Sequence, residues 1–172
     1  ADKGALILTE RTLKDAESGL DLATLTSTTF ARGNGGYDGP SDEAPRPHKV
    51  PEREPDFAVD LTTLDMAALI YRLSGDYNPL HASPSVARAA GFPKPILHGL
   101  CSLGVAGHAI LKGCCDYDAK RLKSLQLRFS SPVYPGETMR TEIWRDGANI
   151  SFKSKIVERD VVVLDNGHAT VE

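Results

Sequence analysis

A carboxylate and an imidazole lie five residues apart in one short stretch of the chain, Ser74-Gly75-Asp76-Tyr77-Asn78-Pro79-Leu80-His81. Neither a helix nor a strand makes residues at this spacing neighbours, so a loop must fold back to bring Asp76 and His81 together. Asn78-Pro79 supplies a suitable turn, because proline fixes its own φ and keeps the preceding residue extended. An aspartate and a histidine held in one small site can act as a general acid–base pair.

Addition of water to an α,β-unsaturated thioester is a reaction that such a pair can perform. It needs a base for the water, an acid for the α carbon, and donors for the charge on the thioester oxygen. Asp76 and His81 can supply the first two, and the sequence leaves open which is the base and which is the acid. Gly99 can supply a donor, because it lies at the start of a predicted helix, where backbone N–H groups lack intrahelical partners. Without a side chain, Gly99 also lets a thioester oxygen approach its N–H closely.

Other interpretations of the same residues remain open at this point. An aspartate and a histidine at this spacing are more often structural or solvent-exposed than catalytic. His98 could complete a zinc site with Asp76 and His81, but a histidine at a helix start is more often a cap or a supporting hydrogen-bond donor. His108 is expected to be a core or interface histidine, and His48 and His168 receive no role. We therefore predict no metal site.

The chain before this loop divides into two parts of different composition. Residues 4–13 and 20–30 are rich in Leu, Ile and Thr and predict two antiparallel strands joined by a turn. The glycines and prolines between residues 33 and 56 are typical of a linker. We assign residues 1–36 to a strand segment, 37–56 to the linker and 57–172 to the main domain.

Helices are predicted on both sides of the loop. Thr62 and Asp65 form a capping-box pattern ahead of a helix over 63–73, and Gly75 follows its end. Ser83, Pro84 and Gly91 delimit a second short helix over 84–90. A third helix over 98–112 is apolar or small around most of its circumference, which predicts burial.

Strands are predicted at 57–61, 125–129, 138–145, 150–158 and 161–164, with turns at Asp146-Gly147 and Asn166-Gly167. The expected packing is therefore an antiparallel sheet wrapped around the buried third helix, an α+β arrangement.

Composition excludes several classes of function. The net charge of -3 and the pI near 6.0 argue against nucleic acid or anionic membrane as the main partner. No apolar run approaches the ~20 residues that cross a bilayer, and no signal peptide is visible. The three cysteines lack the spacing of a zinc site or a disulfide framework, which favours a reducing compartment.

The loop resembles, without a mismatch, the signature of the (R)-specific enoyl-CoA hydratases, the hydratase 2 or MaoC-like dehydratase family. The likeness extends over residues 57–172, and it looks closest to the hydratase 2 region of peroxisomal multifunctional enzyme type 2. Three segments carry it: Tyr71-Arg72-Leu73-Ser74-Gly75-Asp76-Tyr77-Asn78-Pro79-Leu80-His81 followed after five residues by Ala87, Gly91-Phe92-Pro93-Lys94-Pro95-Ile96-Leu97-His98-Gly99, and Arg128-Phe129-Ser130-Ser131-Pro132-Val133-Tyr134-Pro135-Gly136.

This resemblance implies a hot-dog fold and reversible conversion of trans-2-enoyl-CoA to (3R)-3-hydroxyacyl-CoA in fatty-acid β-oxidation, without a metal or organic cofactor. Asp76 and His81 become the catalytic dyad, Asn78 positions them, and Gly99 is the oxyanion donor. Phe129 matches a position that contacts the CoA thioester. Further candidates for contacts with substrate or CoA are Lys3, in an Asp-Lys-Gly step before a strand, and the motif residues Tyr77 and Leu80.

One departure from the family concerns the first segment. Eukaryotic members join two hot-dog repeats, and residues 1–36 resemble only the closing strands of the degenerate first repeat. An isolated two-stranded hairpin is marginally stable, so a homodimer or a complex with the missing first-repeat segment is expected. The resemblance suggests a peroxisomal location although no targeting signal is visible, and a cytoplasmic location otherwise.

Two other functions are open. The site could work as a dehydratase on other acyl thioesters in lipid or polyketide synthesis. Alternatively, the chain could be a non-catalytic module that binds acyl-CoA.

Overall fold

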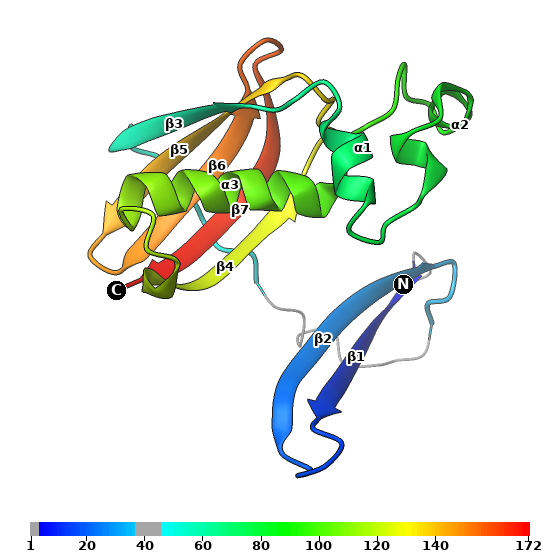
Figure 1. The fold of residues 1–172 in the computed structure, drawn as a ribbon, viewed down its shortest axis with the longest axis horizontal. Coiled ribbons are helices and arrows are strands. Elements are labelled where there is room, and N and C mark those ends of the chain that lie inside the picture. The colour runs from blue at the N-terminus through cyan, green and yellow to red at the C-terminus, as the bar shows by residue number, and fades with distance from the viewer. Residues whose placement is uncertain (1–3, 37–45) are drawn as a thin grey trace. The chain divides into compact units, whose positions relative to one another are not determined.

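A computed structural model describes residues 4–36 and 46–172, and the chain divides into two compact units, Ala1–Pro45 and Arg46–Glu172 (Figure 1). In the first unit, β1 (Gly4–Lys14) pairs with β2 (Asp21–Arg32) as an antiparallel hairpin. Asp15 closes the turn, because its carboxylate accepts hydrogen bonds from the backbone N–H and the hydroxyl of Ser18. The two strands that the sequence predicts here are confirmed.

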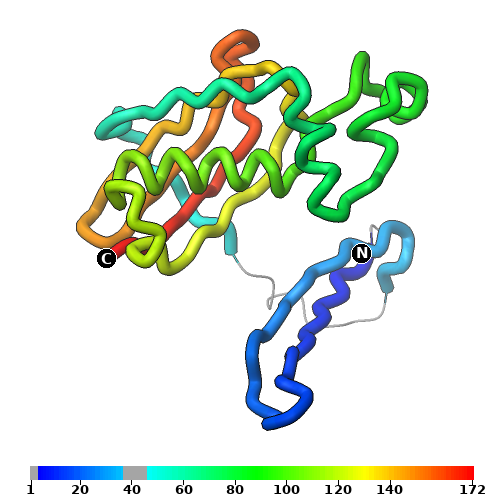
Figure 2. The backbone as a smooth tube through the Cα atoms, in the orientation of Figure 1, coloured from blue at the N-terminus to red at the C-terminus, as the bar shows by residue number. Residues whose placement is uncertain are grey.

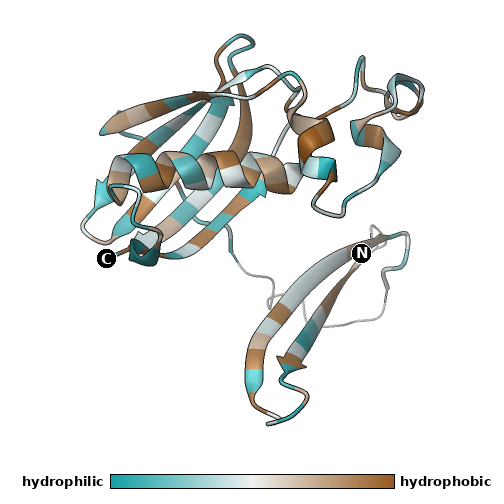
Figure 3. Cartoon of the chain, in the orientation of Figure 1, coloured by the Kyte–Doolittle hydropathy of each residue, from teal (hydrophilic) through white to brown (hydrophobic). Residues whose placement is uncertain are grey.

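The hairpin has backbone pairing but no core. Between residues 4 and 32 no residue is buried. Apolar residues occur along both strands (Figure 3), and their exposed fractions run from 44% to 68%. They are Leu6, Ile7, Leu8, Leu13, Leu20, Leu22, Leu25 and Phe30.

The second unit is a five-stranded antiparallel sheet with a helix across one face. The strand order is β3-β5-β6-β7-β4, and α3 (Gly99–Cys114) lies over the sheet (Figure 1). The predicted α+β hot-dog arrangement is confirmed. The strands are β3 (Phe57–Thr62), β4 (Leu122–Phe129), β5 (Thr138–Asp146), β6 (Asn149–Ile156) and β7 (Val161–Val171).

The core lies between α3 and the sheet. Alternate residues of β5 and β6 point toward the helix, and Met139, Ile143, Ile150 and Phe152 have no exposed surface. The helix contributes six buried residues: Ser102, Ala106, Gly107, Ala109, Ile110 and Cys114. Its opposite side presents an exposed stripe at four-residue spacing, Leu100, Gly104, His108 and Lys112.

Two details differ from the sequence predictions. The first helix, α1 (Ala67–Arg72), begins later than predicted, and the capping box is wrong. Thr62 ends β3 instead, and the Thr63 hydroxyl donates to the Glu137 carbonyl and accepts from the Gly136 N–H.

The second difference is at Asn166-Gly167, where β7 continues through the predicted turn. Its pairing shifts by one residue against β4 and β6 there, which makes this a β-bulge. Asn166 adopts a φ of +54°. The turn-like dipeptide Asn166-Gly167 therefore lies at a bulge within a continuous strand.

An excursion between β3 and α3 carries α1, the 3₁₀ turn η1 (Pro79–His81) and α2 (Pro84–Ala89) at one end of the long helix (Figure 2). Gly75 follows α1 with a φ of +108°, the left-handed conformation that its place after the helix predicts. A second 3₁₀ turn, η2 (Ala119–Arg121), leads from α3 into β4. Of the helices that the structure describes, none has the length and apolar character to span a membrane.

Candidate active site

Two side-chain-to-backbone hydrogen bonds fold the loop after α1. The Asp76 carboxylate accepts from the N–H of Asn78 at 3.2 Å, and the Asn78 side-chain oxygen accepts from the N–H of Leu80 at 3.0 Å. Pro79 then opens η1, which ends on His81. This local chemistry bends the chain back within six residues, as the Asn-Pro turn predicts.

His81 is fixed by its Nδ1, which lies 2.8 Å from the carbonyl oxygen of Ile96. A carbonyl only accepts, so Nδ1 carries the proton and Nε2 has the lone pair in the neutral ring. A carboxylate oxygen of Asp76 and ring nitrogens of His81 and His98 all lie within 4.8 Å of one another. The structure therefore brings together the predicted carboxylate and imidazole, with His81 half-buried and Asp76 exposed.

Gly99 is the first residue of α3, directly after His98 at the N-cap. A Cβ at position 99 would lie 3.3 Å from the nearest ring carbon of Phe129, closer than most such contacts. Glycine thus keeps this helix start and the end of β4 in close approach.

A cavity of about 330 Å³ joins these residues. The cavity is lined by His81, Gly99 and Phe129, which the sequence analysis singled out, and by further residues that the sequence analysis missed. The other lining residues are Phe92, Ile96, Leu97, Ser102, Ser130, Ser131, Pro132, Val133 and Leu164. Because a mostly apolar wall surrounds a few polar groups, the cavity suits a ligand that is largely aliphatic with one polar centre.

His81 also lines a second cavity of about 310 Å³. The remaining walls of this cavity come from α1, the residues next to α1 and η1, and two proline-containing loops: Asp65, Ala68, Leu69, Ala82, Lys94, Pro95 and Pro135. His81 is thus shared by both cavities.

Two predicted contact residues, Tyr77 and Leu80, are not brought into this arrangement. Tyr77 is 62% exposed, with the Arg72 guanidinium 5.5 Å from its ring centroid. Leu80 is half-buried, and neither residue lines the two cavities. Lys3 lies outside the described residues.

His98 is the residue that the sequence analysis considered as a possible zinc ligand and, more often, as a cap or a supporting hydrogen-bond donor. Its side chain is nearly completely buried, at 1% exposed, and its ring stacks on that of His81 with centroids 3.7 Å apart. Burial lowers the pKa of His98 below its usual value; the hydrogen bond to the Asp76 carbonyl acts in the opposite direction. The sequence analysis included His98 in the family motif that ends at Gly99. It could not predict the stack of His98 on His81, because this depends on how α3 packs against the loop.

The same three side chains are the group in the described residues that could hold a metal ion. Imidazole lone pairs lie in the ring plane, and the rings of His81 and His98 are stacked at an interplanar angle of 26°. Their lone pairs therefore run side by side instead of converging on one point, as tetrahedral zinc requires. That no metal binds at these three side chains stays a prediction.

The family model described as "MaoC like domain" matches residues 47–167. "Enoyl-CoA hydratase 2, peroxisomal" of Arabidopsis thaliana is 41% identical over 95% of this chain and 56% of its own length. "Peroxisomal multifunctional enzyme type 2" of Mus musculus is 45% identical over 82% of this chain and 20% of its own length. A solved MaoC-like dehydratase from Phytophthora capsici superposes with a TM-score of 0.87 at 42% identity, over 99% of this chain and 60% of its own. The chain thus spans less than two thirds of these relatives.

Proposed function

From the premise that the chain belongs to the MaoC-like domain family, we propose that it catalyses reversible hydration of trans-2-enoyl-CoA to (3R)-3-hydroxyacyl-CoA in fatty-acid β-oxidation. The observation that carries this proposal is the approach of the Asp76 carboxylate and the His81 ring within 4.8 Å, beside a cavity that Gly99 lines. The enoyl-CoA hydratase 2 relative from Arabidopsis supports the substrate class.

In this mechanism the two side chains move protons. The neutral His81 ring has its lone pair at Nε2, because Nδ1 donates to Ile96, and Nε2 can take a proton from water. Asp76 is the second proton-transfer group: in its protonated form it would give a proton to the α carbon, and the His81 imidazolium would then return the proton taken from water to Asp76. Asn78 holds Asp76 by donating its N–H to the carboxyl group. In the reverse reaction, dehydration, the two groups exchange their acid and base roles.

The thioester oxygen gains negative charge when hydroxide adds to the β carbon. The N–H of Gly99, at the N-terminus of α3, is the donor that we propose for it. Phe129 packs on Gly99 in the same cavity and would contact the thioester end of the ligand. Tyr77, Leu80 and Lys3 remain candidates for contacts with the rest of the CoA ester.

The reaction needs no metal or organic cofactor, because protein groups supply both proton transfers and the charge stabilisation. For assembly we propose a homodimer, or a complex with a segment that completes the first repeat, because the hairpin leaves its apolar side chains uncovered. The peroxisomal names of the Arabidopsis and mouse relatives support a peroxisomal location.

A second candidate has the same site with a different substrate. The Phytophthora neighbour is named a MaoC-like dehydratase, and the alternative that we keep is dehydration of other 3-hydroxyacyl thioesters in lipid or polyketide synthesis. A ladder of CoA-bound and carrier-protein-bound substrates separates the two, since the lead proposal requires the higher kcat/KM on CoA esters.

The decisive experiment follows the loss of enoyl absorbance of trans-2-enoyl-CoA in Asp76→Asn and His81→Ala. Each substitution removes one proton-transfer group and should lower kcat by at least ~10². Chiral analysis of the product should give the (3R) alcohol.

His108→Ala is the matched control, because it removes an exposed imidazole from α3 without touching the loop. It should keep full activity. Enoyl-CoA binding by calorimetry with no turnover in the unmodified protein would instead favour a non-catalytic acyl-CoA module.

A further inference from the structure

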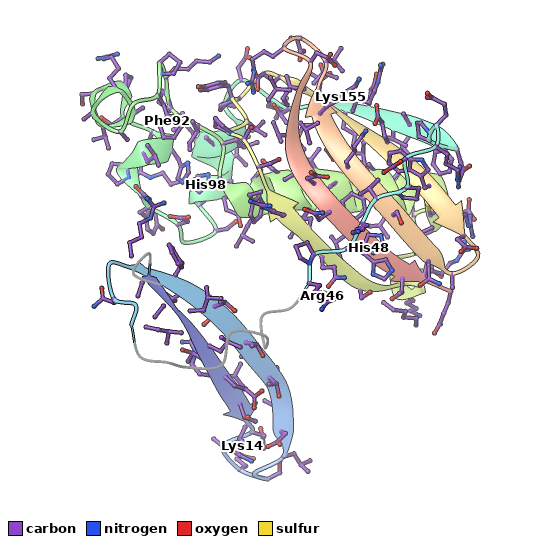
Figure 4. All side chains as sticks on the ribbon, turned by 180° about the vertical axis from the view of Figure 1, so that it is seen from behind. Lys14, Arg46, His48, Phe92, His98 and Lys155 are labelled. Atoms are coloured by element: carbon purple, nitrogen blue, oxygen red, sulfur yellow. The ribbon has the colours of Figure 1, made fainter. Side chains whose placement is uncertain are left out.

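One imidazole contacts both members of the proposed dyad. His98 Nε2 lies 3.2 Å from the backbone carbonyl oxygen of Asp76, and the His98 ring stacks on His81. The two ends of the loop between Asp76 and His81 are therefore held against the same side chain. Figure 4 labels His98 at the start of α3, where the helix meets this loop.

The hydrogen bond defines the protonation state of His98. A carbonyl oxygen accepts only, so Nε2 must carry a proton. Nδ1 is buried and has no hydrogen-bond partner among the described residues. A second proton on Nδ1 would leave a charged N–H without an acceptor, so the ring is neutral with its proton on Nε2.

The surroundings of His98 restrict its movement. The ring of Tyr71 lies on it with centroids 4.7 Å apart, which adds a second aromatic contact beside that of His81. The His98 carbonyl accepts from both the N–H and the hydroxyl of Ser102, one turn along α3. A side chain held this firmly can restrain the exposed loop that contacts it.

We infer that His98 is a positioning residue: its Nε2–H bond to the Asp76 carbonyl and its stack on His81 hold the proposed dyad in register with the adjacent Gly99 N–H. This inference rests on the proposed function. Because His98 and Gly99 are consecutive, one residue pair at the start of α3 sets the places of all three reacting groups.

Three substitutions separate the two contacts. His98→Gln keeps a donor at the place of Nε2 but loses the ring. His98→Phe keeps a ring for stacking but loses the donor, and His98→Ala loses both. Because small displacements of reacting groups cost about 10² in rate, His98→Ala should lower kcat by roughly that factor, with KM changed by less than about threefold.

The glutamine and phenylalanine variants should each recover about tenfold of the kcat that alanine loses, since each retains one contact. Thermal unfolding of all three variants serves as the structural readout. Unchanged kcat in all three variants would overturn the inference, as would a loss confined to KM. His108→Ala should behave as the unmodified protein in every assay.

Nitrogen-15 spectra of the histidine rings test the geometry without any turnover. His98 should keep the neutral tautomer protonated at Nε2 at pH values below the usual histidine pKa of about 6.5, and His98→Ala should disturb the backbone amide signals from Asp76 to His81. If the unmodified protein hydrates no enoyl-CoA, the proposed function fails, while these spectra still decide the positioning role. A freely titrating His98 would refute it.

Discussion

The β1–β2 hairpin and the five-stranded sheet satisfy their backbone hydrogen bonds in the same manner, yet only the sheet has a core. The hairpin pairs in one register from Gly4 with Arg32 to Leu13 with Ala23, and no residue from 4 to 32 is buried. In the sheet, α3 covers one face and buries the inward residues of β5 and β6. Backbone pairing alone contributes little net free energy, because water competes for the same groups, whereas covering an apolar face removes it from water.

The strongest test of this contrast is amide hydrogen exchange. Hairpin amides should exchange through local opening that costs almost no free energy in the monomeric chain. Amides of β5 and β6 should require unfolding of the second unit, at ~5–15 kcal/mol. Mass spectrometry of peptides from each unit measures the difference, and equal protection of both units in a monomer would contradict it.

A matched pair of substitutions sharpens the same contrast. Ile150 is fully buried in β6, and Ile7 in β1 is 52% exposed. Ile150→Ala should lower the free energy of unfolding by ~2–5 kcal/mol, through lost burial and the cavity left behind. Ile7→Ala should change it by less than about 0.5 kcal/mol, as measured by urea unfolding. A large effect of Ile7→Ala would mean that a partner covers the hairpin.

Tight packing in the sheet also makes the bulge at Gly167 sensitive to an added side chain. A Cβ at Gly167 would collide with the backbone oxygen of Phe152, so Gly167→Ala should destabilise the second unit by ~1–3 kcal/mol. Gly104→Ala is the control, because nothing lies near a Cβ at that exposed helix position. It should stabilise by ~0.4–1 kcal/mol, since alanine loses less chain entropy. Equal thermal shifts for both variants would rule out this account.

The smallest expected effect is in pH dependence. Burial lowers the pKa of both His98 and His48 from the usual 6.5. The stability that these neutral histidines contribute is fully present above pH 6.5. It is lost as the pH falls from 6.5 toward their lower pKa values in the folded protein, because in that range the unfolded chain binds more protons than the folded one. In the hairpin, hydrogen bonds from Ser18 lower the pKa of Asp15 from 3.8, so its contribution declines only in stronger acid. The free energy of unfolding of the second unit should therefore fall as the pH is lowered from 8 to 5, as measured by urea unfolding at each pH. His98→Phe should make this free energy depend less on pH.

The sequence predicts which helices and strands form better than it predicts the residues at which they begin and end. Glycines and prolines located the loop from Gly75 to His81, because turn chemistry is local. The start of α1 was misplaced, since Thr63 bonds to Glu137, 74 residues away. The turn at Asn166-Gly167 was wrong for a similar reason, because neighbouring strands hold the dipeptide in a bulge.

The site shows the same division. Asp76, His81 and Gly99 could be chosen from residue type and spacing, because each belongs to a recognisable motif. The stack of His81 on His98 could not, because it depends on the packing of α3 against the loop. The cavity walls from Phe92 and Leu164 were missed for the same reason.

If the proposed function holds, the succession of His98 and Gly99 at the start of α3 matters for a redesign of the acyl specificity. The two residues are joined by one peptide bond, so an engineered shift or tilt of the helix would move the support of the proposed dyad and the proposed oxyanion donor together. Mutations for a new chain length should therefore begin at other lining residues of the cavity, at Leu164 in β7 and at Val133 in the loop between β4 and β5, to which the proposed mechanism gives no role.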